Sequence, residues 1–183
     1  DPGPLLGRTG APSATPGGTL PADAAARARA ARPSPGRAPA EITRIVVTKF
    51  HPVPLITDLY ALGVRDVGEN RQQELTAKHR EVGGLDGLRW HFIGQAQTNK
   101  ARAVRAASDA VHSVDRTRIA DALDAADDGS RLDVLLQVNL TDDPGRGGVA
   151  PTDVEALAAH VAALESLRVR GVMAVAPLDE DPV

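Results

Sequence analysis

Several polar side chains stand where apolar segments of the chain end, and their chemistry suits attachment and binding of a small ligand. These residues are Lys49, Asn70, Gln95, Ser113, Asp115 and Asn139. A lysine amine can form a Schiff base with a carbonyl compound, and amides and hydroxyls can hold a ligand by hydrogen bonds. If the apolar segments are parallel strands, their carboxyl ends meet at one face, and we expect these residues to gather there.

Lys49 carries the most specific expectation. It follows the β-branched segment 45–48, so we expect its ammonium to lie against apolar walls. Desolvation disfavours the charged form and lowers a lysine's pKa, as a Schiff-base amine requires. The alternative is a lysine that extends from a strand end into solvent.

The other polar motifs allow both a functional and a purely structural interpretation. His91 lies on one strand face with Ile93 and Gln95, either to meet a ligand or as a hydrogen-bonded core residue. Segment 97–100 begins a helix that either holds an anion or has a simple N-cap. Segment 144–148 has only part of a phosphate-loop pattern, which favours an ordinary loop. The five histidines lack zinc-site spacing and there is no cysteine, so we predict no metal site.

Hydrophobic patterning predicts six strands that alternate with helices. The strands are expected at 42–48, 64–68, 90–94, 110–114, 132–138 and 169–175, and the helices at 54–62, 71–81, 98–107, 117–127 and from Val154 to Leu164. Alternation indicates a parallel sheet, either doubly wound or closed as a barrel. Polar residues at the end of nearly every strand favour the α/β class with a (β/α)8 TIM barrel. A whole barrel takes about 250 residues, so we expect one truncated to about six β/α units.

Composition limits the other classes of function. The chain has 183 residues, a net charge of −3 and no cysteine, which excludes disulfides and gives no electrostatic case for nucleic acid or a membrane surface. Residues 1–40 are rich in Pro, Gly, Ala and Arg, and we expect a disordered leader there and a barrel domain at 41–183. The single methionine is Met173, so the sequence is expected to be a processed chain or a fragment.

Taken together, the motifs of this chain resemble those of the pyridoxal phosphate homeostasis protein family, whose fold is the alanine racemase N-terminal barrel. The matching segments are 47–49 (VTK), 66–71 (DVGENR), 90–100 (WHFIGQAQTNK), 111–115 (VHSVD), 137–139 (QVN), 146–148 (RGG) and 171–177 (GVMAVAP). In this order and at these spacings, across residues 41–178, the set is specific. Ala96 differs from the larger aliphatic residue that is usual in the family.

The resemblance implies a protein that binds pyridoxal 5′-phosphate (PLP) as a Schiff base on Lys49, with Asn70 near the cofactor on the same face. It also implies a role in PLP homeostasis without established turnover, in a cytoplasmic monomer that serves PLP-dependent client enzymes. The phosphate-binding residues of the family are expected beyond residue 183. Two alternatives stay open: a racemase-like enzyme, for which His91 is the nearest acid/base candidate, and a barrel fragment without a competent site.

Overall fold

The fold is a six-stranded parallel sheet whose strands follow the order of the sequence. The structure is a computed structural model that describes residue 38 and residues 41–176. The strands are β1 (Val46–Val47), β2 (Asp66–Glu69), β3 (Arg89–Phe92), β4 (Ala110–Val114), β5 (Leu132–Val138) and β6 (Leu167–Ala174). The α-helices are α2 (Val53–Ala61), α3 (Gln72–Val82), α4 (Ala101–Arg105), α5 (Thr117–Asp124) and α6 (Val154–Ala162). Short 3₁₀ turns are η2 (Thr98–Lys100), η3 (Pro144–Arg146) and η4 (Pro151–Asp153).

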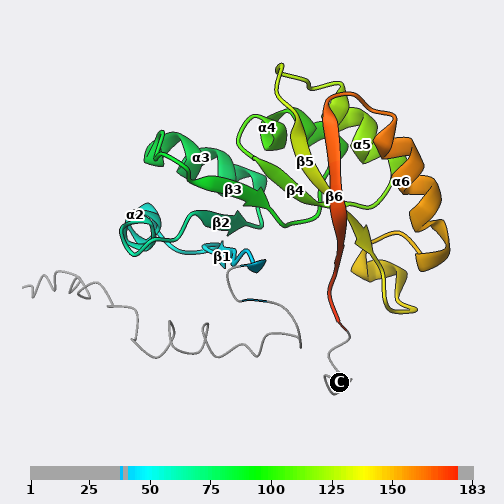
Figure 1. The fold of residues 1–183 in the computed structure, drawn as a ribbon, viewed down its shortest axis with the longest axis horizontal. Helices are drawn as coiled ribbons and strands as arrows, with labels where there is room; N and C mark the ends of the chain where they lie inside the picture. The colour runs from blue at the N-terminus through cyan, green and yellow to red at the C-terminus, as the bar shows by residue number, and fades with distance from the viewer. Residues whose placement is uncertain (1–37, 39–40, 177–183) are drawn as a thin grey trace, which may run out of the picture. The chain divides into compact units, whose positions relative to one another are not determined.

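The strand order distinguishes between the two sheet types that the sequence allowed. Each strand pairs in parallel with the next one along the chain, from β1 to β6. A doubly wound sheet reverses its order at a switch point, whereas a barrel adds strands in one direction. The sheet curves with its helices along the outside (Figure 1), so the barrel type is confirmed for the described strands.

One apolar core joins the helices to the outward side of the strands. Val67, Trp90, Val111 and Val134 of the sheet belong to the same buried cluster as Leu75 of α3 and the buried residues of α5 and α6. Side chains alternate along a strand, so the intervening residues lie on the opposite, inner face of the sheet. That inner face carries polar groups, which are available to a site.

The predicted elements agree with the observed ones except at several ends. β4 and β5 match the predicted 110–114 and 132–138, but β1 is only two residues long and the predicted helix 98–107 is split into η2 and α4. α5 begins after Arg116 and α6 after Asp153, and neither helix has a side-chain hydrogen bond at its N-cap. The predicted leader, residues 1–40, lies outside the described residues apart from Ala38.

Candidate functional site at the carboxyl ends of the strands

Five of the six polar residues predicted to gather at one end of the sheet follow a strand end, and Ser113 is the exception. Lys49 lies two residues after β1, Asn70 directly after β2, and Asn139 directly after β5. Because Val47 pairs with Gly68, Lys49 and Asn70 are each two residues beyond a paired position and lie at the same level of the sheet. Gln95 follows β3, while Ser113 is buried within β4 and Asp115 follows it.

The backbone beside Lys49 is fixed by a buried ionic network on the helix side of the sheet. The hydroxyl of Thr48 donates to Oε1 of Glu69 at 2.6 Å, and both residues are fully buried. The ammonium of Lys78, on α3, donates to the same Oε1 at 2.8 Å and to the backbone oxygen of Thr48 at 2.8 Å. Charge-assisted bonds of this length are strong in a buried setting, so the strand end that presents Lys49 is held in place.

Phe50, the next residue, has an unusual backbone conformation. Its φ is +65°, in the left-handed region that residues with a β-carbon rarely adopt. The Phe50 N–H donates to Glu74 at 3.0 Å, and this bond is the main reason that the pKa of the Glu74 carboxyl lies below its ordinary value. Two cations lie near the exposed Phe50 ring, Lys49 Nζ at 5.8 Å and the Arg71 guanidinium at 5.1 Å from its centre. Such strain persists where surrounding contacts impose it, often at functional sites.

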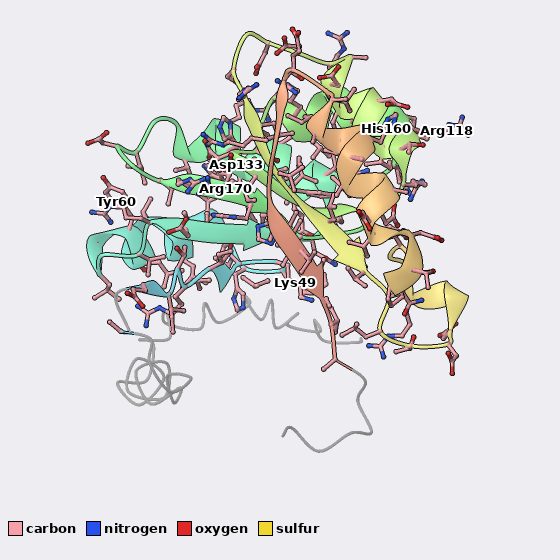
Figure 2. The ribbon with its side chains drawn as sticks, turned by 45° about the vertical axis from the view of Figure 1, so that its right-hand side comes forward. Lys49, Tyr60, Arg118, Asp133, His160 and Arg170 are labelled. Carbon is pink, nitrogen blue, oxygen red and sulfur yellow. The ribbon has the colours of Figure 1, made fainter. Side chains whose placement is uncertain are left out.

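The surroundings of Lys49 differ from the expected apolar walls. The Lys49 side chain is exposed, so the desolvation that the sequence suggested is absent from this structure. Within residues 41–176, Lys49 has no ion-pair partner, whereas Lys78 is committed to Glu69 and Glu74. Lys49 is therefore an accessible primary amine on a fixed backbone at the carboxyl end of the sheet (Figure 2).

Asn70 lies where two neighbouring loops meet. A β-carbon on Gly94 would stand 1.8 Å from the backbone oxygen of Asn70, so only glycine fits at position 94. Asn70 also lines a small pocket of about 170 Å³ together with Gln95, Gln97 and Lys100. The segment 97–100 thus begins a short helix beside Asn70, and Gln97 caps it without a side-chain bond.

His91 is a hydrogen-bonded residue of the inner face and not a free acid or base. Its Nε2 lies 2.9 Å from Asp66 Oδ1, and its Nδ1 lies 2.9 Å from His112 Nε2. The simplest proton assignment has Nε2–H of His91 donating to Asp66 and Nε2–H of His112 donating to His91. Burial, followed by repulsion from His91, lowers the pKa of His112 to about 4, so it is neutral at pH 7.

The remaining motifs behave as structural features. In segment 144–148, Asp143 accepts from the Gly145 N–H at 2.8 Å, and the loop returns so that Val149 bridges to Val138. No group of acidic, histidine or cysteine residues in the described ranges could hold a metal ion. No helix in residues 41–176 has the length and apolar character of a membrane span.

Sequence reasoning missed the supports beneath Lys49. Glu69 lies within the matched segment 66–71 and holds Thr48 and Lys78, whereas Lys78 lies outside every matched segment. Glu74 and Lys78 have the i,i+4 spacing of a helical ion pair, which was the available signal. That spacing alone does not show that the ammonium of Lys78 reaches β1, because the contact depends on how α3 packs against the sheet.

Comparison with curated proteins shows long matches to one group. A pyridoxal phosphate homeostasis protein of Pseudomonas aeruginosa is 42% identical over 156 residues, which is 84% of this chain and 67% of that protein. The protein of the same name from Mycobacterium tuberculosis is 39% identical over 176 residues, covering 85% of this chain and 68% of its own length. The Escherichia coli protein of the same name is 41% identical over 144 residues, which is 76% of this chain and 62% of that protein. The chain thus spans about two thirds of these relatives.

Solved structures agree with the fold. PipY of Synechococcus elongatus without PLP superposes with a TM-score of 0.76 at 36% identity, over 87% of this chain and 72% of PipY. PipY with PLP bound superposes with a TM-score of 0.73 at 35% identity, over 86% of this chain and 71% of PipY. Alanine racemase from Corynebacterium glutamicum superposes with a TM-score of 0.55 at 16% identity, over 71% of this chain and 37% of the racemase. At this identity the match shows a shared fold alone.

The family model "Alanine racemase, N-terminal domain" matches residues 45–182. That range contains Lys49, Asn70 and every strand of the sheet. With the sequence identities above, this match confirms the resemblance seen in the motifs: the chain belongs to the pyridoxal phosphate homeostasis protein family, built on the alanine racemase N-terminal domain.

Proposed function

We propose that this protein binds PLP through a Schiff base on Lys49 and serves intracellular PLP homeostasis as a carrier or regulator, without catalytic turnover. The observation that carries the proposal is the state of Lys49: an exposed amine, unpaired in the described part of the chain, on a strand end fixed by buried contacts. The names of the relatives and the PLP-bound PipY structure support the choice of ligand.

The residues present fit such a group. A free amine is what an aldehyde requires, and Thr48, Glu69 and Lys78 fix its backbone without using it. Asn70 stands at the same level, directly after the neighbouring strand, and offers an amide for a hydrogen bond. PLP would supply an aldehyde and an electron sink, while the protein supplies attachment and orientation.

The structure favours a carrier over a racemase. The sequence left His91 as the nearest acid/base candidate, but both of its ring nitrogens are occupied at 2.9 Å by Asp66 and His112. A racemase needs a second acid or base that reaches the substrate from the opposite side. His91 in this arrangement holds the inner face of the sheet together and is not available for that task.

The wider biological role rests on the family alone. We propose PLP-dependent enzymes as clients of the carrier, with the protein acting as a cytoplasmic monomer. We also propose the domain division of the sequence, with a leader at residues 1–40 and the barrel domain at 41–183. The barrel fragment without a competent site is the competing hypothesis, and it predicts no cofactor binding by the 183-residue chain.

The test is direct spectroscopy of the 183-residue chain mixed with PLP. We expect a Schiff-base absorption band that borohydride fixes, with the reduced adduct located on the Lys49 peptide by mass spectrometry. Lys49→Ala should lose the band, and Lys100→Ala, at the same end of the sheet, should keep it. A full band in Lys49→Ala would remove the assignment, and no band in the parent chain would support the fragment hypothesis.

Absence of turnover is tested separately. Exchange of the α-proton of alanine with solvent deuterium, followed by mass spectrometry in the presence of PLP, should equal that of PLP alone. Exchange well above that background, lost in Lys49→Ala, would instead establish a racemase-like enzyme.

A further inference from the structure

A second pocket lies at the opposite, amino-terminal end of the strands. Its volume is about 350 Å³, within the usual range for small-molecule sites. Arg89 begins β3, and Asp133 and Arg168 are the second residues of β5 and β6, and all three line this pocket. Lys49 follows the carboxyl end of β1, so the two sites are at opposite ends of the parallel strands.

Three arginines converge on one carboxylate beside this pocket. Arg168 Nε lies 2.6 Å from Asp133 Oδ1, while Arg89 Nη2 and Arg170 Nε lie 3.2 and 3.7 Å from Oδ2. Burial opposes ionisation of Asp133, but the hydrogen bond from Arg168 and the charges of the arginines hold its pKa below the ordinary value. We call Arg89, Arg168 and Arg170 the arginine cluster; Figure 2 labels Asp133 and Arg170, which lie close together.

The charge of the arginine cluster exceeds that of its carboxylate. One buried carboxylate meets three guanidiniums, whose side chains are 46, 50 and 57% exposed. The other two acids of the pocket are occupied elsewhere: Asp109 accepts from the Trp90 N–H at 2.7 Å, and Asp128 lies 3.7 Å from the buried Arg105. Among the described residues, two positive charges of the cluster are therefore left for solvent or for a ligand.

The unused donors indicate which ligand fits. Each guanidinium has five N–H groups in a planar fork. Within residues 41–176, Arg89 and Arg168 each use one of these groups in a hydrogen bond, and both bonds go to Asp133. Arg131, outside the arginine cluster, also lines the pocket and donates its Nε–H to the backbone oxygen of Glu165, and no hydrogen bond within residues 41–176 uses its terminal groups. Planar forks of this kind match the oxygens of phosphate.

We propose that this pocket binds the phosphate group of a small phosphomonoester, with Arg89 and Arg168 as the ligating side chains. A dianion would balance the two excess charges of the arginine cluster. The volume of about 350 Å³ leaves room for a few carbon atoms beyond the phosphate itself. The proposal is independent of Lys49 and of the function proposed above.

Isothermal titration calorimetry of the full chain, at constant ionic strength, tests the site with glycerol 3-phosphate and with inorganic phosphate as probes. Saturable binding of the ester, tighter than that of inorganic phosphate, is the expected result. Equal affinities for the ester and for inorganic phosphate would overturn the proposal of a phosphomonoester and assign the site to free phosphate. No saturable binding of either would overturn the site itself.

Variants locate the binding on the arginine cluster. Arg168→Gln and Arg89→Gln should each weaken binding of the ester by roughly tenfold, since each change removes a charge-assisted hydrogen-bond donor. Both leave Asp133 with two other arginines, so folding, checked by circular dichroism, should be retained. Asp133→Asn should strengthen binding, because it removes the competing carboxylate.

Matched controls separate this site from general charge effects and from the Lys49 site. Arg102→Gln, an exposed change on α4, removes the same charge and should alter binding by less than about twofold. Lys49→Ala should leave binding unchanged. If Arg168→Gln and Arg102→Gln bind the ester alike, the arginine cluster is a structural ion-pair group and the proposal is wrong.

Discussion

The buried ion pair between Lys78 and Glu69 holds the strand end that presents Lys49, and its removal tests that arrangement. Lys78→Met keeps a flexible apolar stem and removes the ammonium. At 2.8 Å and an effective dielectric constant of about 20, the gross attraction is about 6 kcal/mol. Desolvation of both groups offsets part of this attraction, so we expect the free energy of unfolding to fall by about 3–5 kcal/mol.

The reason for the loss is the carboxylate that stays behind. Glu69 is fully buried, and its Oε2 already has no hydrogen-bond partner in the described part of the chain. Without Lys78 the Thr48 hydroxyl is the remaining donor to this charge among the described side chains. The double change Glu69→Gln with Lys78→Met removes the charge as well, and it should be more stable than Lys78→Met alone.

Urea unfolding followed by tryptophan fluorescence measures both effects, because Trp90 is the single tryptophan and is only 3% exposed. Arg80→Met, on the exposed side of the same helix, serves as the control and should change the free energy of unfolding by less than about 0.5 kcal/mol. A loss below about 1 kcal/mol for Lys78→Met would refute the reasoning. So would single effects of Glu69→Gln and Lys78→Met that add within about 0.5 kcal/mol.

Three further predictions use the same unfolding assay. Gly94→Ala should lower the free energy of unfolding by about 3 kcal/mol, because its β-carbon would meet the backbone oxygen of Asn70 at 1.8 Å. Gly84→Ala, with open space around it, should leave that free energy unchanged. Equal effects of the two changes would contradict the close approach at Gly94. Thr48→Val should cost about 1.5–3 kcal/mol, since it removes a donor from a buried carboxylate, and a neutral result would show that the hydroxyl bond is dispensable. The pKa of His112 is about 4 in the folded chain and ordinarily 6.5, so between these pH values the unfolded chain binds more protons than the folded chain. The free energy of unfolding should therefore rise with pH across that interval, by about 2 kcal/mol after solvent screening. His112→Asn should flatten this rise, and an unchanged slope would assign it to another group.

Apolar patterning predicted the central strands because their sequences leave little choice. β4 is buried throughout, β5 has no exposed residue, and each segment is bounded by polar residues. β1 is shorter than its β-branched sequence suggests because strand length depends on pairing, and its recorded partners are Val67 and Gly68. Whether a polar side chain caps a helix depends on which neighbour it meets. Asp115, two residues before α5, accepts a hydrogen bond from Arg116.

The candidate site was predictable in position but not in its contacts. A strand-end rule places Lys49 and Asn70 together because parallel strands share an end. The contacts that define their chemistry join residues far apart in sequence: Lys78 reaches Thr48 across 30 positions, and His91 reaches His112 across 21. No local pattern contains such pairings. For the same reason the sequence left open whether Lys49 is buried and whether His91 is free.

In the proposed function, Lys49 and Lys78 divide two tasks that a single lysine could not perform together. An ammonium that holds a buried carboxylate is committed to the folded state, as Lys78 is at 2.8 Å from both Glu69 and the Thr48 oxygen. An amine that reacts with an aldehyde must be free of such bonds, and Lys49 meets this condition among residues 41–176. Lys49→Ala should therefore abolish the PLP adduct while it changes the free energy of unfolding by less than about 0.5 kcal/mol. Lys78→Met should lower the free energy of unfolding strongly. Under conditions where this variant stays folded, it should still form the PLP adduct on Lys49. If both variants lost stability and adduct in parallel, the two lysines would act as one unit, and the separation of support from chemistry would be wrong.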